Sequence, residues 1–299
     1  SLSRLFNSNE IELVAFITHQ SCFNLIRNGT TTKSHVLTRF CIDNSISLIT
    51  NAQIFKMFAA SLNTASNAYS VSREIDSIQS GNIIRLPYLV DCHTHMREPG
   101  GIHKEDFSSG TRSAIAGGIS CVLCMPNTIP PLLDGDSFHM IDELARTKCI
   151  CDYGLIAGSS MTNAQNHYVL SKKCPALKLY LNPTFTSLRL EGVTAWLQHF
   201  ETWSNDLPIC VHAEGETLAV VLNIAHIYKK KIHVCHVSKK NEIETIKMAK
   251  LKNPGVTCEV CPHHLFLTSD YSNVIGEKRI RVKPELGTLE DQQSLWNNL

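Results

Sequence analysis

Seven short apolar runs recur at similar intervals from residue 83 onward, and they constrain the fold more than any other feature. They are LVDCHTHM (89–96), SCVLCMP (120–126), CDYGLIAG (151–158), ALKLYLN (176–182), PICVHAE (208–214), KIHVCHV (231–237) and VTCEVCP (256–262). Helix-like segments such as NEIETIKMAKL (241–251) lie between several of them. Strands that alternate with helices in this way are typical of βα units and a parallel sheet. Because polar or reactive residues follow the strands' carboxyl ends, the pattern predicts an α/β fold of the (β/α)₈ TIM-type barrel kind, truncated before strand 8, which we expect beyond Leu299.

The first 82 residues have a different character. Residues 1–62 hold α/β material that is too short for a complete domain, whereas residues 63–82 are polar and read as a linker. The parts of the first zone are an apolar run (11–18), a Gly/Thr/Asn-rich loop (28–33), a helix-like segment (35–44), a short strand (47–50) and an amphipathic segment (51–62). We therefore expect a partial α/β segment at 1–62, a linker at 63–82 and the barrel at 83–299. Since the chain opens at Ser1 without a methionine and stops after a helix-like segment at 289–299, we expect it to be an excerpt from a longer polypeptide.

Composition excludes several classes of protein. The 28 Lys and Arg residues nearly balance the 27 Asp and Glu residues, which argues against a nucleic-acid-binding surface, and KKK (229–231) is the one basic run in its favour. No apolar run approaches the ~18–20 residues that a membrane span needs. The first residues also lack the layout of a signal peptide, so a cytoplasmic location is expected. Most of the 12 cysteines sit in apolar runs, which fits reduced buried thiols.

A histidine pair in the first run is the strongest chemical signal. In DCHTHMREPGG (91–101), His93 and His95 are two residues apart, so in a strand both would point to one side. Two imidazoles that converge inside a barrel predict a divalent-metal site. An isolated pair of this kind is also compatible with two satisfied core histidines.

Three further residues favour the metal interpretation. His212 and His236 end later strands, at the same relative place as the first pair, so four histidines are expected to meet at the carboxyl face of the barrel. Lys178 stands within the apolar run 176–182, where loss of solvation favours the neutral amine. Such an amine combines with carbon dioxide to form a carbamate, which is able to bridge two metal ions. A lysine in a strand is otherwise ion-paired or directed toward solvent.

These residues lie in stretches that resemble one family. DCHTHMREPGGIHKEDF, MPNTIPPLLD, LKLYLN, VHAE, CHVSKKNEI and CEVCPHHLF are similar to the dihydroorotases of the amidohydrolase superfamily of metal-dependent barrels. They look most like the dihydroorotase domain of the multifunctional proteins that fuse carbamoyl-phosphate synthetase, dihydroorotase and aspartate transcarbamylase. The prefix HVLTRFCIDNSISLITNAQIFKMFAASL resembles the end of the synthetase's methylglyoxal-synthase-like regulatory domain.

The resemblance implies a metal-ligand set. His93, His95 and carboxylated Lys178 would bind a first zinc ion, and Lys178, His212 and His236 would bind a second. Glu259, a charge inside an apolar strand, would hold an additional zinc ion together with Cys235. His263 and His264 follow Pro262 near the mouth, where we expect a structural role.

It also implies a reaction and its substrate contacts. The reaction is the reversible closure of N-carbamoyl-L-aspartate to dihydroorotate in pyrimidine biosynthesis. Arg97 and Asn127 match residues that hold the substrate carboxylate, and Lys283 stands where close members have an arginine. The family's general base is an aspartate after the eighth strand, expected beyond Leu299, so residues 1–299 alone are expected to be inactive. The implied partners are covalently linked synthetase and transcarbamylase domains and a homo-oligomer, without nucleic acid or membrane.

Two alternatives stay open. A hydantoinase or dihydropyrimidinase shares the histidine pair, the lysine and the two later histidines, although REPGG (97–101) and the prefix argue against it. The other alternative is a catalytically inactive dihydroorotase-like scaffold that joins domains in an assembly. Metal content would separate the scaffold from an enzyme.

Overall fold

The computed structural model describes residues 13–15, 47–49 and 89–299, and the chain divides into two compact units, Ser1–Ile84 and Arg85–Leu299. In the first unit, β1 (Leu13–Ala15) and β2 (Ser47–Ile49) pair in parallel with Leu13 opposite Ser47. The short strand expected at 47–50 is therefore present. The expected features at 28–33, 35–44, 51–62 and 63–82 lie outside the described residues, and the domain boundaries stay predictions.

The second unit contains a strand in every predicted run. The strands are β3 (Leu89–Thr94), β4 (Ile119–Cys124), β5 (Asp152–Leu155), β6 (Ala157–Gly158), β7 (Leu177–Tyr180), β8 (Ile209–His212), β9 (Ile232–Val234) and β10 (Val256–Cys258). Consecutive strands pair in parallel, except that β5 and β6 do not pair with each other. The strands therefore form two sheets, with the orders β3-β4-β5 and β10-β9-β8-β7-β6. The parallel α/β architecture predicted from the spacing is confirmed.

The predicted run 151–158 forms two strands because its backbone changes partner at Ile156. The Ile156 N–H donates to the Cys124 carbonyl of β4 at 2.9 Å, whereas the next N–H, of Ala157, donates to the Ala176 carbonyl before β7 at 3.0 Å. The two sheets are therefore consecutive parts of one curved arrangement, joined through this segment.

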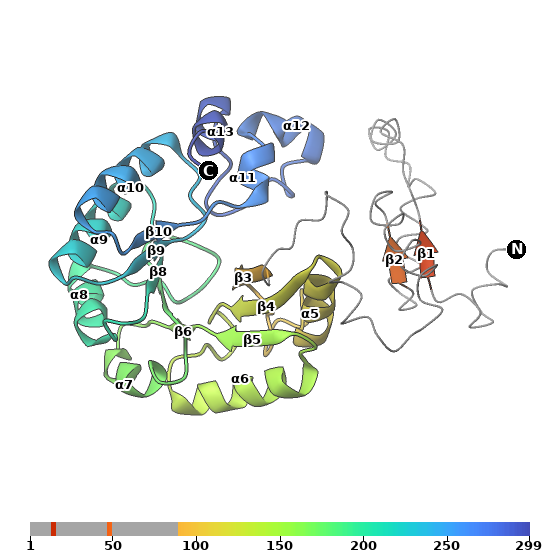
Figure 1. Ribbon diagram of the computed structural model, residues 1–299, viewed down its shortest axis with the longest axis horizontal. Helices are drawn as coiled ribbons and strands as arrows, with labels where there is room; N and C mark the ends of the chain where they lie inside the picture. Colours follow the sequence, from red (N-terminus) through yellow and green to blue (C-terminus); the bar gives the residue numbers. More distant parts are fainter. Residues whose placement is uncertain (1–12, 16–46, 50–88) are drawn as a thin grey trace, which may run out of the picture. The chain divides into compact units, whose positions relative to one another are not determined.

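Helices follow the strands and lie on their outer side (Figure 1). They are α5 (Phe107–Ala116), α6 (Gly135–Lys148), α7 (His167–Leu170), α8 (Val193–Thr202), α9 (Gly215–Ile227), α10 (Lys240–Lys252), α11 (Pro262–Phe266), α12 (Ser272–Ile275) and α13 (Leu289–Trp296), with 3₁₀ turns at Ala164–Asn166 and Ser269–Tyr271. Asp106 caps α5 and Asp134 caps α6, because each carboxylate accepts a backbone N–H three residues on, at 2.7 and 2.8 Å. None of the helices in the described part of the chain is long and apolar enough to cross a membrane.

Alternation along the buried strands directs side chains into two cores. Leu177 and Leu179 of β7, with Ile209 and Val211 of β8, belong to the large apolar cluster that also contains helix residues. Cys210, between the two β8 residues, belongs instead to a smaller cluster with Met125, Ile156, Ala176 and Cys235. The first set faces the helices and the second faces the interior of the curved sheet. The same alternation places Lys178 and His212 on the interior side.

β3 and β10 are the two edges of this arrangement. Within residues 89–299, β3 pairs only with β4, and β10 pairs only with β9. The side chains of Leu89 and Val90 at the outer edge are 44% and 52% exposed. A strand between β3 and β10 would close a barrel, but closure by an eighth strand and its place in the sequence stay predictions.

Because of their different burial, Leu177 and Leu251 are expected to contribute very differently to the free energy of unfolding. Leu177 in β7 is fully buried, whereas Leu251 near the end of α10 is 80% exposed. Leu177→Ala should lower the free energy of unfolding by about 2–5 kcal/mol, because it leaves a cavity in a packed core. Leu251→Ala should change it by less than about 0.5 kcal/mol. Urea titration of both variants measures the difference, and equal effects would contradict the assigned core.

Candidate active site

The structure brings the four predicted histidines together. His93 lies in β3, His95 just after it, His212 ends β8, and His236 follows β9. The ring centroids of His93 and His95 are 5.3 Å apart, those of His93 and His236 are 5.2 Å apart, and those of His212 and His236 are 4.5 Å apart. Three strands that are distant in sequence thus deliver imidazoles to one place at their carboxyl ends.

Lys178 projects into the same region without a hydrogen-bond partner. Its side chain is fully buried, and its Nζ has no acceptor within the described residues. The centroid of the Tyr180 ring is 5.2 Å from Nζ. An uncompensated buried ammonium is costly. A carboxyl group on Nζ that shares bound cations would remove this cost, so the residue fits a carbamate ligand.

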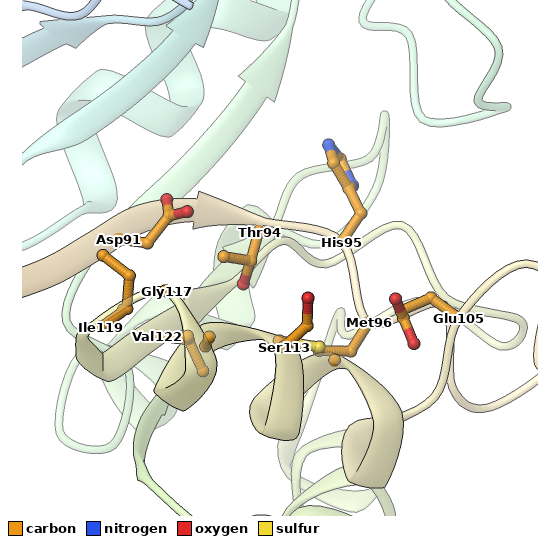
Figure 2. A pocket seen from close by; sticks show the side chains of 11 residues that line it. Asp91, Thr94, His95, Met96, Glu105, Ser113, Gly117, Ile119 and Val122 are labelled. Carbon is orange, nitrogen blue, oxygen red and sulfur yellow. The ribbon is translucent and has the colours of Figure 1, made fainter. Parts of the chain in front are cut away.

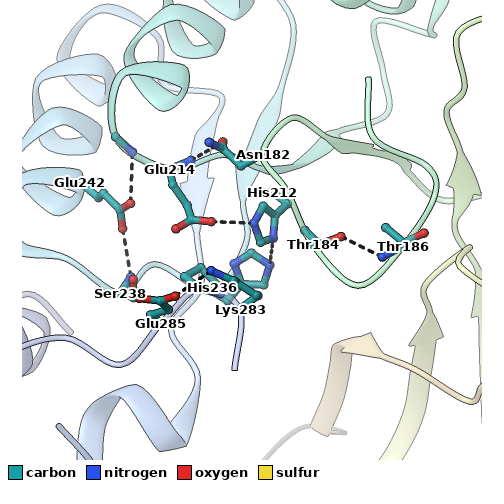
Figure 3. A network of polar contacts seen from close by, with 12 residues as sticks. Asn182, Thr184, Thr186, His212, Glu214, His236, Ser238, Glu242, Lys283 and Glu285 are labelled. Atoms are coloured by element: carbon teal, nitrogen blue, oxygen red, sulfur yellow. Dashed lines mark hydrogen bonds and ion pairs between the residues drawn. The ribbon is translucent and has the colours of Figure 1, made fainter. Parts of the chain in front are cut away.

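Hydrogen bonds link His212 and His236 and leave one ring nitrogen of His236 free (Figure 3). His212 donates from Nε2 to Glu214 Oε1 at 3.0 Å and accepts at Nδ1 from His236 Nε2, also at 3.0 Å. The buried Nδ1 of His236 then carries an unshared lone pair and has no partner among the described residues. A metal ligand needs this arrangement, with one ring nitrogen oriented by a hydrogen bond and the other free.

His95 is oriented in the same way by Asn127. Its Nδ1 donates to Asn127 Oδ1 at 2.7 Å, which leaves Nε2 free for a cation. Burial, followed by the charges of Arg97 and His93, lowers the pKa of His95 to about 3, so this ring is neutral near pH 7. The amide nitrogen of Asn127 does not take part in this bond and is available to donate to a ligand.

Glu259, His93 and Cys235 form a second group of donors. One ligand atom from each lies within 4.8 Å of the others. The Glu259 carboxylate contacts His93 Nδ1 and accepts from His233 Nε2 at 3.1 Å and from the His236 backbone N–H at 3.2 Å. The sequence predicted Glu259 and Cys235 as an additional metal site, and the structure places them against His93.

Hydrogen bonds and nearby charges shift the pKa values of all three residues in this group. Burial would lower the pKa of His93, but its hydrogen bonds to Cys235 and Glu259 raise it to about 8. Burial would raise the pKa of Glu259, but hydrogen bonds from His233 and His93 hold it below its usual value. Burial would likewise raise the pKa of Cys235, yet the Cys210 hydrogen bond and nearby positive charges hold it well below the usual range. A protonated imidazole thus stands between two anionic donors, where a divalent cation would fit.

Arg97 lines a cavity of about 250 Å³ with Asn127. Its backbone has φ of 58°, which is rare for a non-glycine residue, and His236 has φ of 40°. Strained backbone of this kind persists where the surroundings fix it, often at functional sites. A Cβ on Gly100 would lie 2.4 Å from the Ile129 Cβ, so the Arg97 loop and the Asn127 loop touch through a position without a side chain.

A second cavity of about 340 Å³ lies beside β3, against α5 and β4. In Figure 2, His95 points to the opposite side of β3 from Thr94. The Thr94 hydroxyl donates to the Leu123 carbonyl at 3.0 Å, so this side chain is directed toward β4. His95 and Thr94 both belong to the lining of this cavity, although their side chains point in opposite directions.

The structure does not bring Lys283 to Arg97. Lys283 Nζ contacts Glu285 Oε1 at 2.8 Å and lines a separate cavity of about 540 Å³. Phe185 lines both cavities and is 80% exposed, so the two openings adjoin at this residue. A substrate contact by Lys283 stays a prediction.

Three polar residues of the site were not predicted. Glu214 orients His212, Asn182 accepts the Glu214 backbone N–H at 2.9 Å, and His233 holds Glu259. All three lie within apolar runs that the sequence had already marked as strands. A polar residue inside such a run was the available signal.

Comparisons with known proteins agree with this geometry. No family model matches the chain. The multifunctional protein CAD of Squalus acanthias is 42% identical over 291 residues, which is 97% of this chain and 13% of that protein. A dihydroorotase of Pyrococcus horikoshii is 33% identical over 74% of this chain and 53% of its own length. Over most of its length the chain is similar to dihydroorotases and to multifunctional proteins of the CAD type.

The chain spans about half the length of the single-domain dihydroorotases that it matches, and far less of the multifunctional ones. Among solved structures, the inactive dihydroorotase-like domain of a Chaetomium thermophilum CAD-like multifunctional protein has a TM-score of 0.61 and 28% identity, covering 72% of this chain and 61% of that one. An L-hydantoinase of Arthrobacter aurescens has the same TM-score at 22% identity over 70% of this chain and 54% of its own, which shows a shared fold.

We expect that a cation binds to the group of His93, Cys235 and Glu259 only when the His93 ring has lost its proton. Because the pKa of His93 is about 8 without metal, the ring is protonated at pH 7 and must lose that proton to bind a cation. Affinity at this group should rise with pH up to about 8, by as much as about tenfold per pH unit for one displaced proton. Chelator competition between pH 6.5 and 8.5, corrected for the chelator's own protonation, measures this slope.

His95 provides the matched control. Its pKa of about 3 means that it is already neutral, so His95→Ala should keep the slope while lowering total metal content. His93→Ala should remove the slope. A pH-independent affinity in the unmodified protein would contradict the assigned protonation of His93.

Proposed function

We propose that this chain supplies the dihydroorotase activity of a multifunctional protein of pyrimidine biosynthesis. The reaction is the reversible, zinc-dependent cyclisation of N-carbamoyl-L-aspartate to (S)-dihydroorotate. One observation carries the proposal: four histidines lie together, and a fully buried lysine that three of them have as a nearby charge has no hydrogen-bond partner among the described residues. The 42% identity to a CAD protein over nearly the whole chain supports the same assignment.

We infer two zinc sites and an additional one. His93, His95 and Lys178 would hold the first ion, and Lys178, His212 and His236 the second, with Lys178 carboxylated on Nζ. Glu259 and Cys235 would hold the additional ion together with His93, because these three ligand atoms lie together. When bound, the ions supply Lewis-acid polarisation of the substrate's amide carbonyl.

The chain's own residues would bind and orient the substrate. The Arg97 guanidinium presents a planar set of N–H donors to the cavity that it lines, and this geometry suits a carboxylate. Asn127 would contact both His95 and the substrate. Its side-chain oxygen orients His95, and its amide N–H groups, which take no part in that bond, would donate to the substrate. Because both groups line one cavity, the substrate carboxylate would be fixed relative to the histidines.

Proton transfer would need a further group. By resemblance this is an aspartate from an eighth strand, and the outer edges of β3 and β10, which have no partner strand among the described residues, are where such a strand would add. We therefore propose that residues 1–299 alone do not turn over substrate. In the multifunctional protein, we propose covalently linked synthetase and transcarbamylase domains, with support from the multifunctional relatives. We also propose a homo-oligomeric assembly and a cytoplasmic location.

An inactive scaffold is the second candidate, because a similar solved domain is described as inactive. The presence of all five of the ligands expected for the first two zinc ions, His93, His95, Lys178, His212 and His236, favours the enzyme. Assay of the full-length protein with dihydroorotate, and separately with hydantoin and dihydrouracil, decides between the candidates. Dihydroorotate turnover with two or more zinc ions per chain supports the proposal. Metal-poor, inactive protein would support the scaffold, and a preference for hydantoin would support a hydantoinase.

Arg97→Ala should raise the KM for dihydroorotate by roughly 10- to 150-fold, because loss of one partner of a charge-assisted pair costs about 1.5–3 kcal/mol. The zinc content should stay unchanged. Arg146→Ala, at an exposed position in α6, is the matched control and should leave KM unchanged. Steady-state kinetics of both variants measures the effect, and an unaltered KM in Arg97→Ala would remove the carboxylate-binding role.

Lys178→Ala should remove most of the bound zinc and the activity together, because the bridging carbamate is lost. Short carboxylic acids such as acetate or propionate should restore part of both. Elemental analysis and turnover with and without the acid measure the effect, with Lys250→Ala at an exposed site of α10 as the control. Full zinc content in Lys178→Ala would show that the lysine is not a ligand.

A further inference from the structure

A second cluster of ligand-type side chains lies just beyond β10. Cys261, His263 and His264 each offer one atom, and these atoms all lie within 4.8 Å of one another. Cys261 directly precedes α11, and the two histidines are in its first turn, with ring centroids 4.3 Å apart. None of the three belongs to the ligand set proposed above.

His264 supplies an independent sign of a missing ligand. Its side chain is only 2% exposed. Its Nε2 donates to the Pro284 carbonyl at 3.1 Å, which fixes the neutral tautomer with a lone pair on Nδ1. That Nδ1 is buried and has no partner among the described residues. A histidine that binds metal through one nitrogen commonly donates from the other to a backbone carbonyl, as His264 does.

The donor types select the class of cation. One thiolate and two imidazoles suit a borderline-soft divalent ion such as Zn²⁺, whereas oxygen-seeking cations prefer carboxylates and carbonyls. Three protein ligands would leave one position of a tetrahedral ion for water.

We propose that Cys261, His263 and His264 form a further zinc-type site, distinct from the group of His93, Cys235 and Glu259. An ion at this site connects the end of β10 and the start of α11 with the Pro284 backbone, through the His264 ring. Lys283 immediately precedes Pro284. The site therefore fixes the segment that carries this lysine.

Cobalt(II) is a suitable probe, because a cysteine thiolate bound to Co²⁺ gives a charge-transfer absorption in the near ultraviolet. The full-length protein in a Cys235→Ala background lacks the sulfur donor of the other group. This variant should still show the band, saturating at one equivalent of thiolate-bound Co²⁺. Cys235→Ala/Cys261→Ala should lose the band, and His263→Ala in the Cys235→Ala background should weaken Co²⁺ binding by more than about tenfold.

Cys258→Ala is the matched control. Cys258 is half-buried, lies three residues before Cys261 and is outside the cluster, so its loss in the Cys235→Ala background should leave the band unchanged. Circular dichroism and unfolding curves establish that each variant is folded. Elemental analysis of zinc-loaded protein should show one zinc ion fewer per chain in Cys261→Ala than in Cys258→Ala.

Three outcomes would overturn the proposal. One is the absence of a charge-transfer band in folded Cys235→Ala protein. Another is a band that survives in Cys235→Ala/Cys261→Ala, which would assign it to a different thiol. The third is equal zinc content in Cys261→Ala and Cys258→Ala. Each readout is independent of dihydroorotase turnover, so this site and the proposed activity can fail separately.

Discussion

The buried amine of Lys178 is the constraint on which the rest of the site depends. A lysine in a strand that is buried along its whole length can neither reach water nor find an acceptor among the described residues. The loss of the amine's solvation is compensated only if a group in the interior binds it or removes its charge. Two histidines of the site have a ring nitrogen that no described hydrogen bond occupies, Nε2 of His95 and Nδ1 of His236. The fold thus buries an amine at an energetic cost, and a carbamate on this amine that binds cations would remove that cost.

Much of the architecture was predictable from two patterns, the spacing of the apolar runs along the chain and the alternation of residues within each run. Apolar runs at regular intervals predicted every strand between residues 89 and 258, and alternation within the runs placed Lys178 and His212 on the interior face. The exchange of partners at Ile156 was not predictable, since a single run of residues gives no sign of where its backbone hydrogen bonds change from one neighbour to the other.

The residues of the site were more predictable than its hydrogen bonds. Ligand-type side chains at strand ends could be named from the sequence, but most of the orienting contacts could not, because apart from the contact between His212 and Glu214 they join residues that are 24 to 166 positions apart. Glu259 illustrates the difference. The sequence marked it as a buried charge that needs a partner, and the structure shows that it contacts both His93 and His233. The contact of Lys283 with Glu285, rather than with the Arg97 cavity, depends on a turn that no periodicity describes.

The close approach of Gly100 to Ile129 has a consequence for which substitutions the molecule tolerates. Gly100 lines the Arg97 cavity without contributing a side chain, and its φ of 90° already disfavours other residues. Any larger residue there would push the Ile129 segment outward, and Asn127, two residues away, would move with it. The hydrogen bond that orients His95 would then lengthen. Because Gly100 has no side chain, the loop of Arg97 and the loop of Asn127 can lie close enough to keep the guanidinium and the amide in fixed relative positions. Selection on catalysis would therefore act on a glycine that takes no part in the chemistry.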